Sequence, residues 1–285
     1  MPRDWNAESY QRVSAPLEAM GREVLDRLEL RGDERVLDAG CGTGRVTAAL
    51  LERLPRGEVV AVDGSPAMVA EARERLGPRV EAHVADLTEL VLEAPADAIL
   101  STATFHWIAD HDRLFSRLHA ALRPGGRLVA QCGGEGNVAE IEAAIARVDE
   151  PALAGWAGPW NFASPAATEQ RLAAAGFTDV WTWRQHVRVE PEDPHEYFAT
   201  IMLGSHLERL PPDRRDPFVE AVLRHVSEGE LAGPGNVAEG CVTSPKPVRE
   251  ANLAGRRNPT ALAGENSMKP AANYVRLNIL ARRPT

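Results

Sequence analysis

The chain has 285 residues, of which 44% are hydrophobic and 26% are charged, and its formal net charge is −9. This composition is typical of one large globular domain, or of one domain with a smaller cap, and the chain is long enough to bury a sizeable core. An acidic balance argues against binding to nucleic acid or to an anionic membrane, because both need clustered positive charge. We therefore expect neither partner, and the oligomeric state stays open.

The cysteines and the N-terminal segment suggest a compartment. Cys41, Cys132 and Cys241 are too few and too scattered for a disulfide framework or a zinc site, so no metal is expected. The first residues, MPRDWNAESYQRV, lack the apolar stretch of a signal peptide, and no uncharged apolar run approaches the roughly 18 residues of a membrane span. A cytoplasmic protein is the expectation.

Short apolar runs alternate with helical patterns through the first part of the chain. Strands separated by helices imply right-handed crossovers, and hence an α/β fold with a doubly wound, Rossmann-like parallel sheet. The predicted strands cover residues 35–40, 58–63, 79–85, 96–103 and 126–132, and the predicted helices cover about 43–54, 66–76 and 112–122.

The pattern becomes more irregular after residue 133. Ser164 and Pro165 are a typical start for a helix that runs to Gly176, and residues 179–189 alternate like a strand. Two amphipathic segments follow between residues 194 and 227. They belong to no strand-helix repeat, so we expect them to form part of a partly helical cap.

The C-terminal part differs in composition from the rest. Glycine, proline and asparagine recur through residues 229–273, which predicts a flexible insertion, and the alternation after it predicts a last strand. The expected organisation is an N-terminal cap helix region (1–30), a cofactor-binding core (31–132), the remainder of the core with a helical cap (133–228), the insertion (229–273) and the final core strand (274–285).

The sharpest motif is VLDAGCGTG, residues 36–44, which closes the first predicted strand and opens the first helix. Glycines at this place let the backbone turn tightly and approach a ligand at the carboxyl edge of the sheet. A tight turn without a ligand is the alternative, because short glycine motifs have many false positives. Asp63 at the end of the second strand favours the ligand, since a carboxylate there can accept from both hydroxyls of a ribose.

The spacing of the motif decides between nucleoside ligands. A dinucleotide fingerprint needs a third glycine where this chain has Arg45, and the loop is entered through the anionic Asp38. An anionic loop suits a ligand with a cationic end, and S-adenosylmethionine carries a sulfonium and an ammonium group.

The chain resembles the class I S-adenosylmethionine-dependent methyltransferases. The resemblance rests on VLDAGCGTG, VVAVDGSPAM, ADLTEL, ADAILSTATFHW and LRPGGRLV, and within the superfamily DWNAESY, SPAMVAEAR and FHW look like the trans-aconitate methyltransferase branch. It implies a seven-stranded sheet whose last strand is antiparallel, with S-adenosylmethionine as the cofactor and a small molecule as the acceptor.

The resemblance also implies roles for single residues. Asp38 would organise the loop, and Asp63 would hold the ribose. Two of the other positions have an ordinary alternative: core packing for Met68, and an N-cap of the next turn for Asp86. The implied cofactor contacts are Ala39, Gly40 and Gly42 for the methionine part, Ser65 and Met68 beside the adenine, Asp86 and Leu87 for the adenine edge, and Thr102 beside the methyl group.

The end of the fourth strand would face the acceptor. There His106 is the candidate catalytic residue, as a general base or as a donor that positions an anion, although it can equally hold the turn. Trp107 is either a cavity wall or a core residue. Tyr10 and Trp160 are candidates to close over the substrate, with interhelix packing as the alternative.

Several functions remain open at this point. The leading hypothesis is methylation of a small molecule, with O-methylation of a carboxylate such as a trans-aconitate-like acid implied by the resemblance alone; cationic or neutral donors would then come from Arg12, Arg184 and His106. Alternatives are methylation of a carrier-bound acyl group or another natural-product intermediate, an NAD-dependent oxidoreductase, and a non-catalytic cofactor-binding protein.

Overall fold

The computed structural model describes residues 5–231 and 270–285. One seven-stranded sheet forms the centre of this part of the chain, in the order β3-β2-β1-β4-β5-β7-β6. Strands β1 to β5 are parallel, and β7 runs antiparallel to both β5 and β6. The strands are β1 (Arg35–Ala39), β2 (Glu58–Asp63), β3 (Val80–Val84), β4 (Ala96–Thr102), β5 (Leu122–Gly133), β6 (Thr178–Val189) and β7 (Ala272–Arg282).

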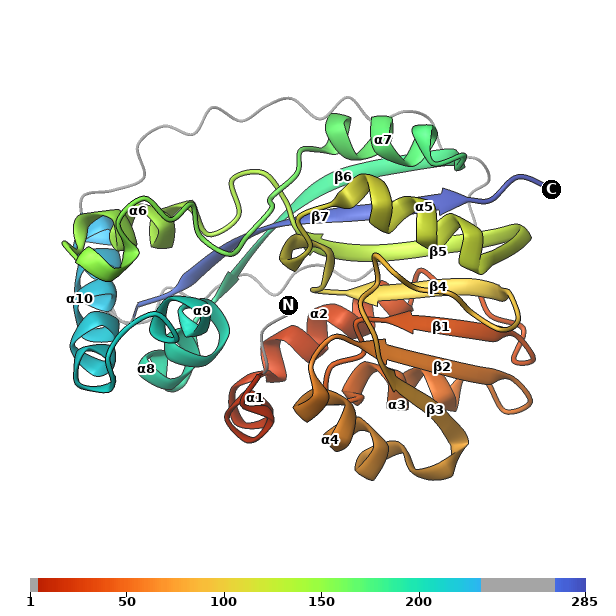
Figure 1. The fold of residues 1–285 in the computed structure, drawn as a ribbon, viewed down its shortest axis with the longest axis horizontal. Helices are drawn as coiled ribbons and strands as arrows, with labels where there is room; N and C mark the ends of the chain where they lie inside the picture. Colours follow the sequence, from red (N-terminus) through yellow and green to blue (C-terminus); the bar gives the residue numbers. More distant parts are fainter. Residues whose placement is uncertain (1–4, 232–269) are drawn as a thin grey trace, which may run out of the picture.

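Helices cover both faces of the sheet, and others gather beyond the carboxyl ends of its parallel strands (Figure 1). Helices α2, α3 and α4 pack on one face, and α5 and α7 on the other. Their bounds are α1 (Ala7–Val13), α2 (Ala15–Leu25), α3 (Arg45–Glu52), α4 (Pro66–Leu76), α5 (His111–Ala121), α6 (Ala139–Arg147), α7 (Pro165–Ala174), α8 (Pro194–Tyr197), α9 (Gly204–Leu207) and α10 (Pro212–Leu231).

Both faces of the central strands are buried, which explains their nearly continuous apolar sequences. Adjacent residues of β1 belong to different clusters: Leu37 packs with the helix α5 side and Val36 with the helix α3 side. A third cluster joins α6, α8 and α10 to the first residues of β7. The predicted doubly wound fold with an antiparallel last strand and a partly helical cap is confirmed.

The element boundaries agree with local capping chemistry. The Ser65 hydroxyl accepts from the Met68 amide and Pro66 follows it, and the same arrangement of Ser164 and Pro165 starts α7. Strand β5 begins at Leu122 and is longer than the predicted 126–132, because Leu122 also pairs with Ala96 of β4, with a register shift before the next pair at Arg127.

The cap is assembled differently from the expected division. Helix α2 packs against β4 and β5 and belongs to the core, so residues 1–30 are not a separate cap region. The expected insertion at 229–273 falls mostly on residues outside the described part, with α10 continuing to Leu231 and β7 starting at Ala272. Among the described residues, no helix is long and apolar enough to cross a membrane.

Candidate active site

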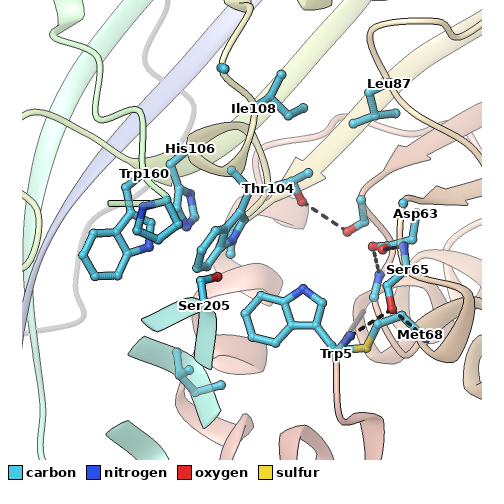
Figure 2. Close-up of a pocket in the computed structure, with 18 of the residues that line it drawn as sticks. Trp5, Asp63, Ser65, Met68, Leu87, Thr104, His106, Ile108, Trp160 and Ser205 are labelled. Carbon is cyan, nitrogen blue, oxygen red and sulfur yellow. Dashed lines mark hydrogen bonds between the residues drawn. The ribbon is translucent and has the colours of Figure 1, made fainter. Parts of the chain in front are cut away.

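A cavity of about 780 Å³ lies at the carboxyl edge of β1, β2 and β4. This volume lies within the roughly 300–1,000 Å³ of most small-molecule sites. In Figure 2, Asp63, Ser65, Met68 and Leu87 lie on one side of the cavity and His106 and Trp160 on the other. We call these sides the cofactor half and the acceptor half.

The glycine loop between β1 and α3 forms the floor of the cofactor half. Gly40 and Gly42 line the cavity and have φ values of +88° and +53°. A Cβ atom on Gly40 would lie 2.0 Å from Thr104 Oγ1, so the loop approaches the end of β4 more closely than any side chain would allow. The predicted glycine turn is present, and it exposes backbone to the cavity.

Asp63 ends β2 with its carboxylate at the cavity. Its two oxygens accept from the backbone amides of Gly42 and Ser65, each at 2.9 Å. Burial raises the pKa of this carboxyl even though those amides favour the charged form. A half-buried carboxylate with further acceptor capacity fits two ribose hydroxyls.

Ser65 and Met68 follow on α4. Ser65 is the N-cap of the helix, and its hydroxyl also accepts from the Trp5 amide at 3.3 Å, which brings the N-terminal segment to the cofactor half. Met68 is 3% exposed, lines the cavity and belongs to none of the three hydrophobic clusters of the described residues. Its place favours a ligand contact over core packing.

Asp86 and Leu87 line the same half after β3. Asp86 Oδ1 accepts from the amide and the hydroxyl of Thr88, both at 2.8 Å, so Asp86 caps the turn that follows while it faces the cavity. Leu87 is 4% exposed and is also part of the core under α5. The two interpretations that the sequence left open for Asp86 are therefore compatible.

Asp38 and Ala39 lie behind the glycine loop instead of on the cavity wall. Asp38 is 1% exposed and accepts from Thr47 Oγ1 at 2.6 Å. Ala39 is fully buried in the core, and its carbonyl accepts from Ser101 Oγ at 2.6 Å. The expected contact of Ala39 with the cofactor is therefore not seen among the lining residues, whereas Asp38 stands where it can support the loop.

The end of β4 carries a strained residue between two threonines. Thr102, Ala103 and Thr104 all line the cavity, and Ala103 has a φ of +56°, which is rare for a residue with a Cβ. Thr104 Oγ1 shares its one hydrogen between the Thr102 carbonyl at 3.0 Å and the Gly40 carbonyl at 3.3 Å. These bonds hold the strand end against the glycine loop at the border of the two halves.

His106 is a neutral donor in this structure. Its Nδ1 accepts from the Gly133 amide at 3.1 Å, so the proton of the neutral ring sits on Nε2. Burial, together with the charge of Arg276, lowers the pKa of His106 well below 6.5. Of the roles considered from the sequence, the general base is disfavoured, because the lone pair that would take a proton is already engaged.

Aromatic rings form the wall opposite the strand ends. Trp107 packs edge-to-face on Trp5 at 5.2 Å between ring centroids and lies 6.2 Å from Trp160, which stacks on Phe162 at 5.5 Å. Tyr10 of α1 also lines the cavity, and burial raises its pKa to about 12. Tyr10, Trp107 and Trp160, the three candidate substrate residues, all line the cavity.

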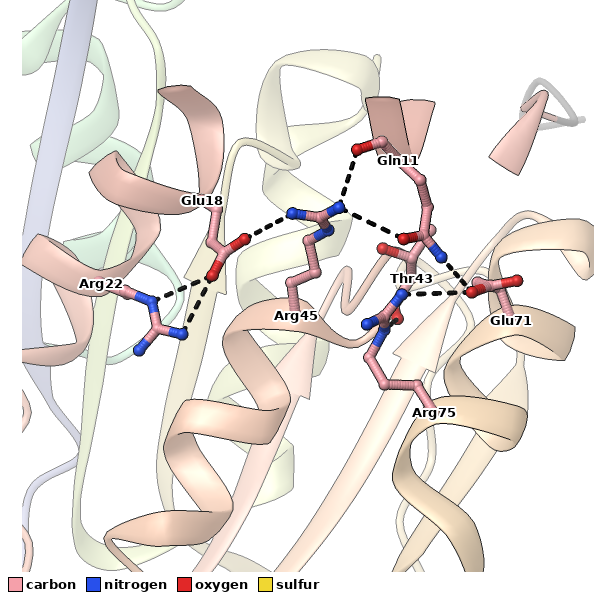
Figure 3. Close-up of polar contacts among 7 residues, drawn as sticks. All are labelled: Gln11, Glu18, Arg22, Thr43, Arg45, Glu71 and Arg75. Atoms are coloured by element: carbon pink, nitrogen blue, oxygen red, sulfur yellow. Dashed lines mark hydrogen bonds and ion pairs between the residues drawn. The ribbon is translucent and has the colours of Figure 1, made fainter. Parts of the chain in front are cut away.

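A group of ion pairs and hydrogen bonds, which we call the clasp, holds the N-terminal helices in place (Figure 3). Arg45, the first residue of α3, donates to Glu18 of α2 at 2.7 Å and to the backbone carbonyl of Gln11 at 2.8 Å. Arg22 donates to the same carboxylate at 3.0 and 3.1 Å. Arg45 follows the glycine loop directly, so the clasp joins α1 and α2 to that loop.

The second part of the clasp reaches α4. The Gln11 amide donates to Glu71, which also accepts from Arg75 at 3.2 Å. Arg75 in turn donates to the carbonyl of Thr43 in the glycine loop at 2.8 Å. Helix α1, which carries Tyr10 and follows Trp5, is thereby fixed over the cavity.

Arg276 of β7 is the main site residue that the sequence analysis missed. It lines the acceptor half, is 3% exposed, and its charge lies close to His106 and Tyr10. Arg12 and Arg184, the cations considered from sequence, do not line the cavity; Arg12 pairs with Glu196 and Glu8, and half-exposed Arg184 lies 3.9 Å from Glu135. The expectation for these two arginines was wrong.

The cofactor half fits S-adenosylmethionine. Gly40 leaves no room for a side chain, and Asp63 presents a half-buried carboxylate for hydroxyl donors. Met68 and Leu87 offer apolar contact for a purine ring. The sheet order and this half-cavity together define a class I S-adenosylmethionine-dependent methyltransferase.

Comparison with known proteins agrees with this class. Residues 36–126 match the family model described as "Methyltransferase domain". The chain is 33% identical over 236 residues to the trans-aconitate 2-methyltransferase of Methylobacterium radiotolerans, covering 78% of this chain and 89% of that protein, and 33% identical over 238 residues to that of Variovorax paradoxus, covering 79% and 90%. The chain belongs to the methyltransferase family that includes these enzymes.

Solved structures show the same fold at lower identity. Phosphoethanolamine N-methyltransferase 2 of Haemonchus contortus, solved with S-adenosyl-L-methionine, has a TM-score of 0.59 at 17% identity, covering 98% of this chain and 57% of that chain. The YcgJ protein of Bacillus subtilis has a TM-score of 0.57 at 17% identity, covering 94% and 98%. The fold does not decide the acceptor, since the first of these is named for an amine and the sequence relatives for an acid.

Proposed function

We propose that the protein methylates a carboxylate oxygen of a small acid that carries more than one carboxylate. The observation that carries this proposal is that Arg276 is buried at the cavity and has no carboxylate partner among the described residues. Its guanidinium is buried at the acceptor half, and its only side-chain hydrogen bond within the described residues goes to the neutral Gln131, at 3.3 Å.

A buried guanidinium without an anion is unfavourable. Burial lowers the pKa of Arg276, and the aromatic face of Tyr274, 5.5 Å away, replaces only part of the lost solvation. A ligand carboxylate supplies both the charge and the planar pair of acceptors that a guanidinium binds best. The acceptor half is therefore suited to an anion.

The protonation of the neighbouring groups points to the same kind of acceptor. His106 has its lone pair engaged, and the raised pKa of Tyr10 keeps that phenol protonated at neutral pH. A carboxylate is already ionised at neutral pH and needs no base, unlike an alcohol or an ammonium group. The hydrogen on His106 Nε2 and the Tyr10 hydroxyl can then orient the acid.

The carboxylate that accepts the methyl group should be a different group from the carboxylate that binds Arg276. S-adenosylmethionine bound in the cofactor half would supply an activated methyl group, and its transfer to a carboxylate oxygen, with loss of the carbon–sulfur bond, would give a methyl ester and S-adenosylhomocysteine. A carboxylate paired with Arg276 in two places has its lone pairs engaged and is a poorer nucleophile. An acid with two or three carboxylates can bind Arg276 with one of them and accept the methyl group on another. Trans-aconitate, the acid in the names of the sequence relatives, is a tricarboxylate.

The rim of the cavity accommodates a further anion. Arg209 lines the cavity and stacks on the Trp156 ring with 4.1 Å from its guanidinium carbon to the ring centroid, and no carboxylate among the described residues pairs with it. Trp156 and Trp160 exclude water from the same end. Arg276 and Arg209 thus offer an inner and an outer position for the groups of a polyacid.

The test is methyl transfer from labelled S-adenosylmethionine to trans-aconitate, to matched monocarboxylic acids, and to a phenol and an amine. We expect a labelled product with trans-aconitate or another polycarboxylic acid. Mild alkali should release the label of this product as methanol, because a methyl ester is hydrolysed under these conditions and an N-methyl or ether group is not. Transfer to the amine or phenol alone would overturn the proposal.

The role of Arg276 has a matched control on the neighbouring strand. Arg276→Gln should raise the KM for the acid by about 10- to 100-fold, since a charge-assisted pair contributes roughly 1.5–3 kcal/mol. Arg184→Gln removes an arginine that lies outside the cavity lining and should leave this KM unchanged. Equal effects of the two substitutions would argue against a specific anion site.

A further inference from the structure

A strip of polar residues crosses one face of the sheet below the acceptor half. Gln131 on β5 lies directly opposite Asn278 on β7, and Arg276, two residues away on the same face of β7, lies opposite Gln185 on β6. Gln131, Arg276 and Asn278 are 2%, 3% and 0% exposed. Three buried polar side chains in the centre of a sheet need a common explanation.

These side chains form one chain of hydrogen bonds that ends at Arg276. Arg276 Nε donates to Gln131 Oε1 at 3.3 Å, and Gln131 Nε2 donates to Asn278 Oδ1 at 2.7 Å and to Gln185 Oε1 at 3.3 Å. Arg27, which follows helix α2, donates to the same Asn278 oxygen and to Gln185 Oε1 at 3.4 Å.

The donor-to-acceptor direction of these hydrogen bonds follows from the two arginines. A guanidinium has only donors, so Asn278 must turn its oxygen toward Arg27. Gln131 must then turn its amino group toward that oxygen, and only its own oxygen is left for Arg276. The orientation of the Gln131 amide is thus fixed by atoms on the side away from the cavity.

We propose that Gln131 is a positioning residue that holds Arg276 toward the acceptor without neutralising it; this inference rests on the proposed function. A carboxylate at position 131 would satisfy the guanidinium internally and compete with the substrate. A neutral amide engages Nε alone, which leaves the terminal nitrogens of Arg276 and its full charge for a ligand carboxylate. Because Gln131 is neutral, it fixes the direction of the Arg276 side chain and leaves the positive charge available for a ligand carboxylate.

The experiment measures the binding of trans-aconitate by calorimetry to the full chain saturated with S-adenosylhomocysteine. Gln131→Glu should weaken the binding of trans-aconitate by more than about tenfold, and Gln131→Met by about three- to tenfold, because the first removes the available charge and the second only the positioning bond. The affinity for S-adenosylhomocysteine should stay within about twofold in both, since Gln131 does not line the cofactor half.

Thr182→Val is the control for a merely structural effect. It removes a half-buried hydrogen bond, from Thr182 to Glu169 at 2.8 Å, on the opposite face of the same sheet. We expect a loss of thermal stability similar to that of Gln131→Met, without a change in acid affinity. Equal acid affinities in wild type and both Gln131 variants would overturn the inference, as would an equal loss in Thr182→Val.

A second measurement separates this inference from the proposed function. The Nε–H of Arg276 should give a protected resonance in ¹⁵N spectra, assigned by its loss in Arg276→Lys, and Gln131→Met should abolish this protection while Thr182→Val keeps it. If wild type fails to bind trans-aconitate, the proposed acceptor is wrong, and the resonance still decides the role of Gln131: unchanged protection in Gln131→Met refutes it.

Discussion

Replacing Asp38 with asparagine should stabilise the protein at neutral pH. Asp38 is 1% exposed under the glycine loop, and the Thr47 hydroxyl is its one side-chain hydrogen-bond donor among the described residues. Burial raises the pKa of this carboxyl from 3.8 to about 6, so the folded chain carries a buried charge at pH 7 and above. Asparagine keeps an oxygen for Thr47 and resembles the protonated acid in shape.

The magnitude follows from the two pKa values. Between pH 4 and 6 the folded chain holds a proton that the unfolded chain has lost, so the free energy of unfolding falls as the pH rises through this range. At about 1.4 kcal/mol per pKa unit, the gap between 3.8 and about 6 corresponds to about 3 kcal/mol. This contribution of Asp38 is fully present below pH 4 and is lost above pH 6.

The assay is urea denaturation of wild type and Asp38→Asn from pH 4 to pH 8, without cofactor. Subtracting the two curves removes every other titrating group, and the variant should gain up to about 3 kcal/mol between pH 4 and pH 7. Thr47→Val should shift the wild-type transition to higher pH, because the hydroxyl stabilises the charged carboxylate. A difference between wild type and Asp38→Asn that does not change with pH would refute the reasoning.

Further predictions concern the cofactor half, the clasp and His106. Asp63→Asn should weaken S-adenosylhomocysteine binding by about 10- to 100-fold in calorimetry, since it removes charge-assisted bonds. Gly40→Ala should abolish cofactor binding, because its Cβ would overlap Thr104. Arg45→Leu should speed hydrogen exchange in α1 and the release of S-adenosylhomocysteine. The pH profile of kcat/KM should show no limb near 6.5, because the pKa of His106 is lowered well below that value.

Each of these results has an outcome that would contradict its reasoning. Unchanged affinity in folded Asp63→Asn would exclude the ribose contact, and a cofactor-binding Gly40→Ala would show that the loop can move away from β4. Unchanged exchange in α1 after loss of Arg45 would mean that packing alone holds the N-terminal helix. A limb near pH 6.5 that disappears in His106→Gln would restore this histidine as a base.

The cofactor half could be predicted from the sequence because its signals are local. Glycines at φ values that other residues avoid, and Asp63 at the end of a strand, mark a ligand site within a short stretch of chain. Ser65 and Pro66 give the start of α4 in the same way. Ala39 shows the limit of this reasoning, because position in the motif does not tell which side of the strand a residue faces.

The place of Arg276 in the acceptor half could not be predicted, because it depends on the order of the strands in the sheet. The alternation in β7 predicts a strand with an apolar face and a polar face, and the polar face would normally be solvent-exposed. The structure places β7 between β5 and β6, so both of its faces are buried and Arg276 and Asn278 lie inside the protein. Strongly polar residues in the predicted last strand of the core were the available signal.

The polar strip is better explained by ligand binding than by stability. Burying Arg276 and the amides of Gln131 and Asn278 costs desolvation, and apolar residues of similar size would stabilise a sheet at least as well. On the opposite face of the same strand, Leu277 and Ile279 pack in the core under α5, so β7 does not need its polar face in order to fold. Neutral partners that hold Arg276 in a fixed direction give a favourable interaction only when an anion binds the guanidinium from the cavity. Acceptor choice in this enzyme should therefore depend on the strip more than on the loops around it.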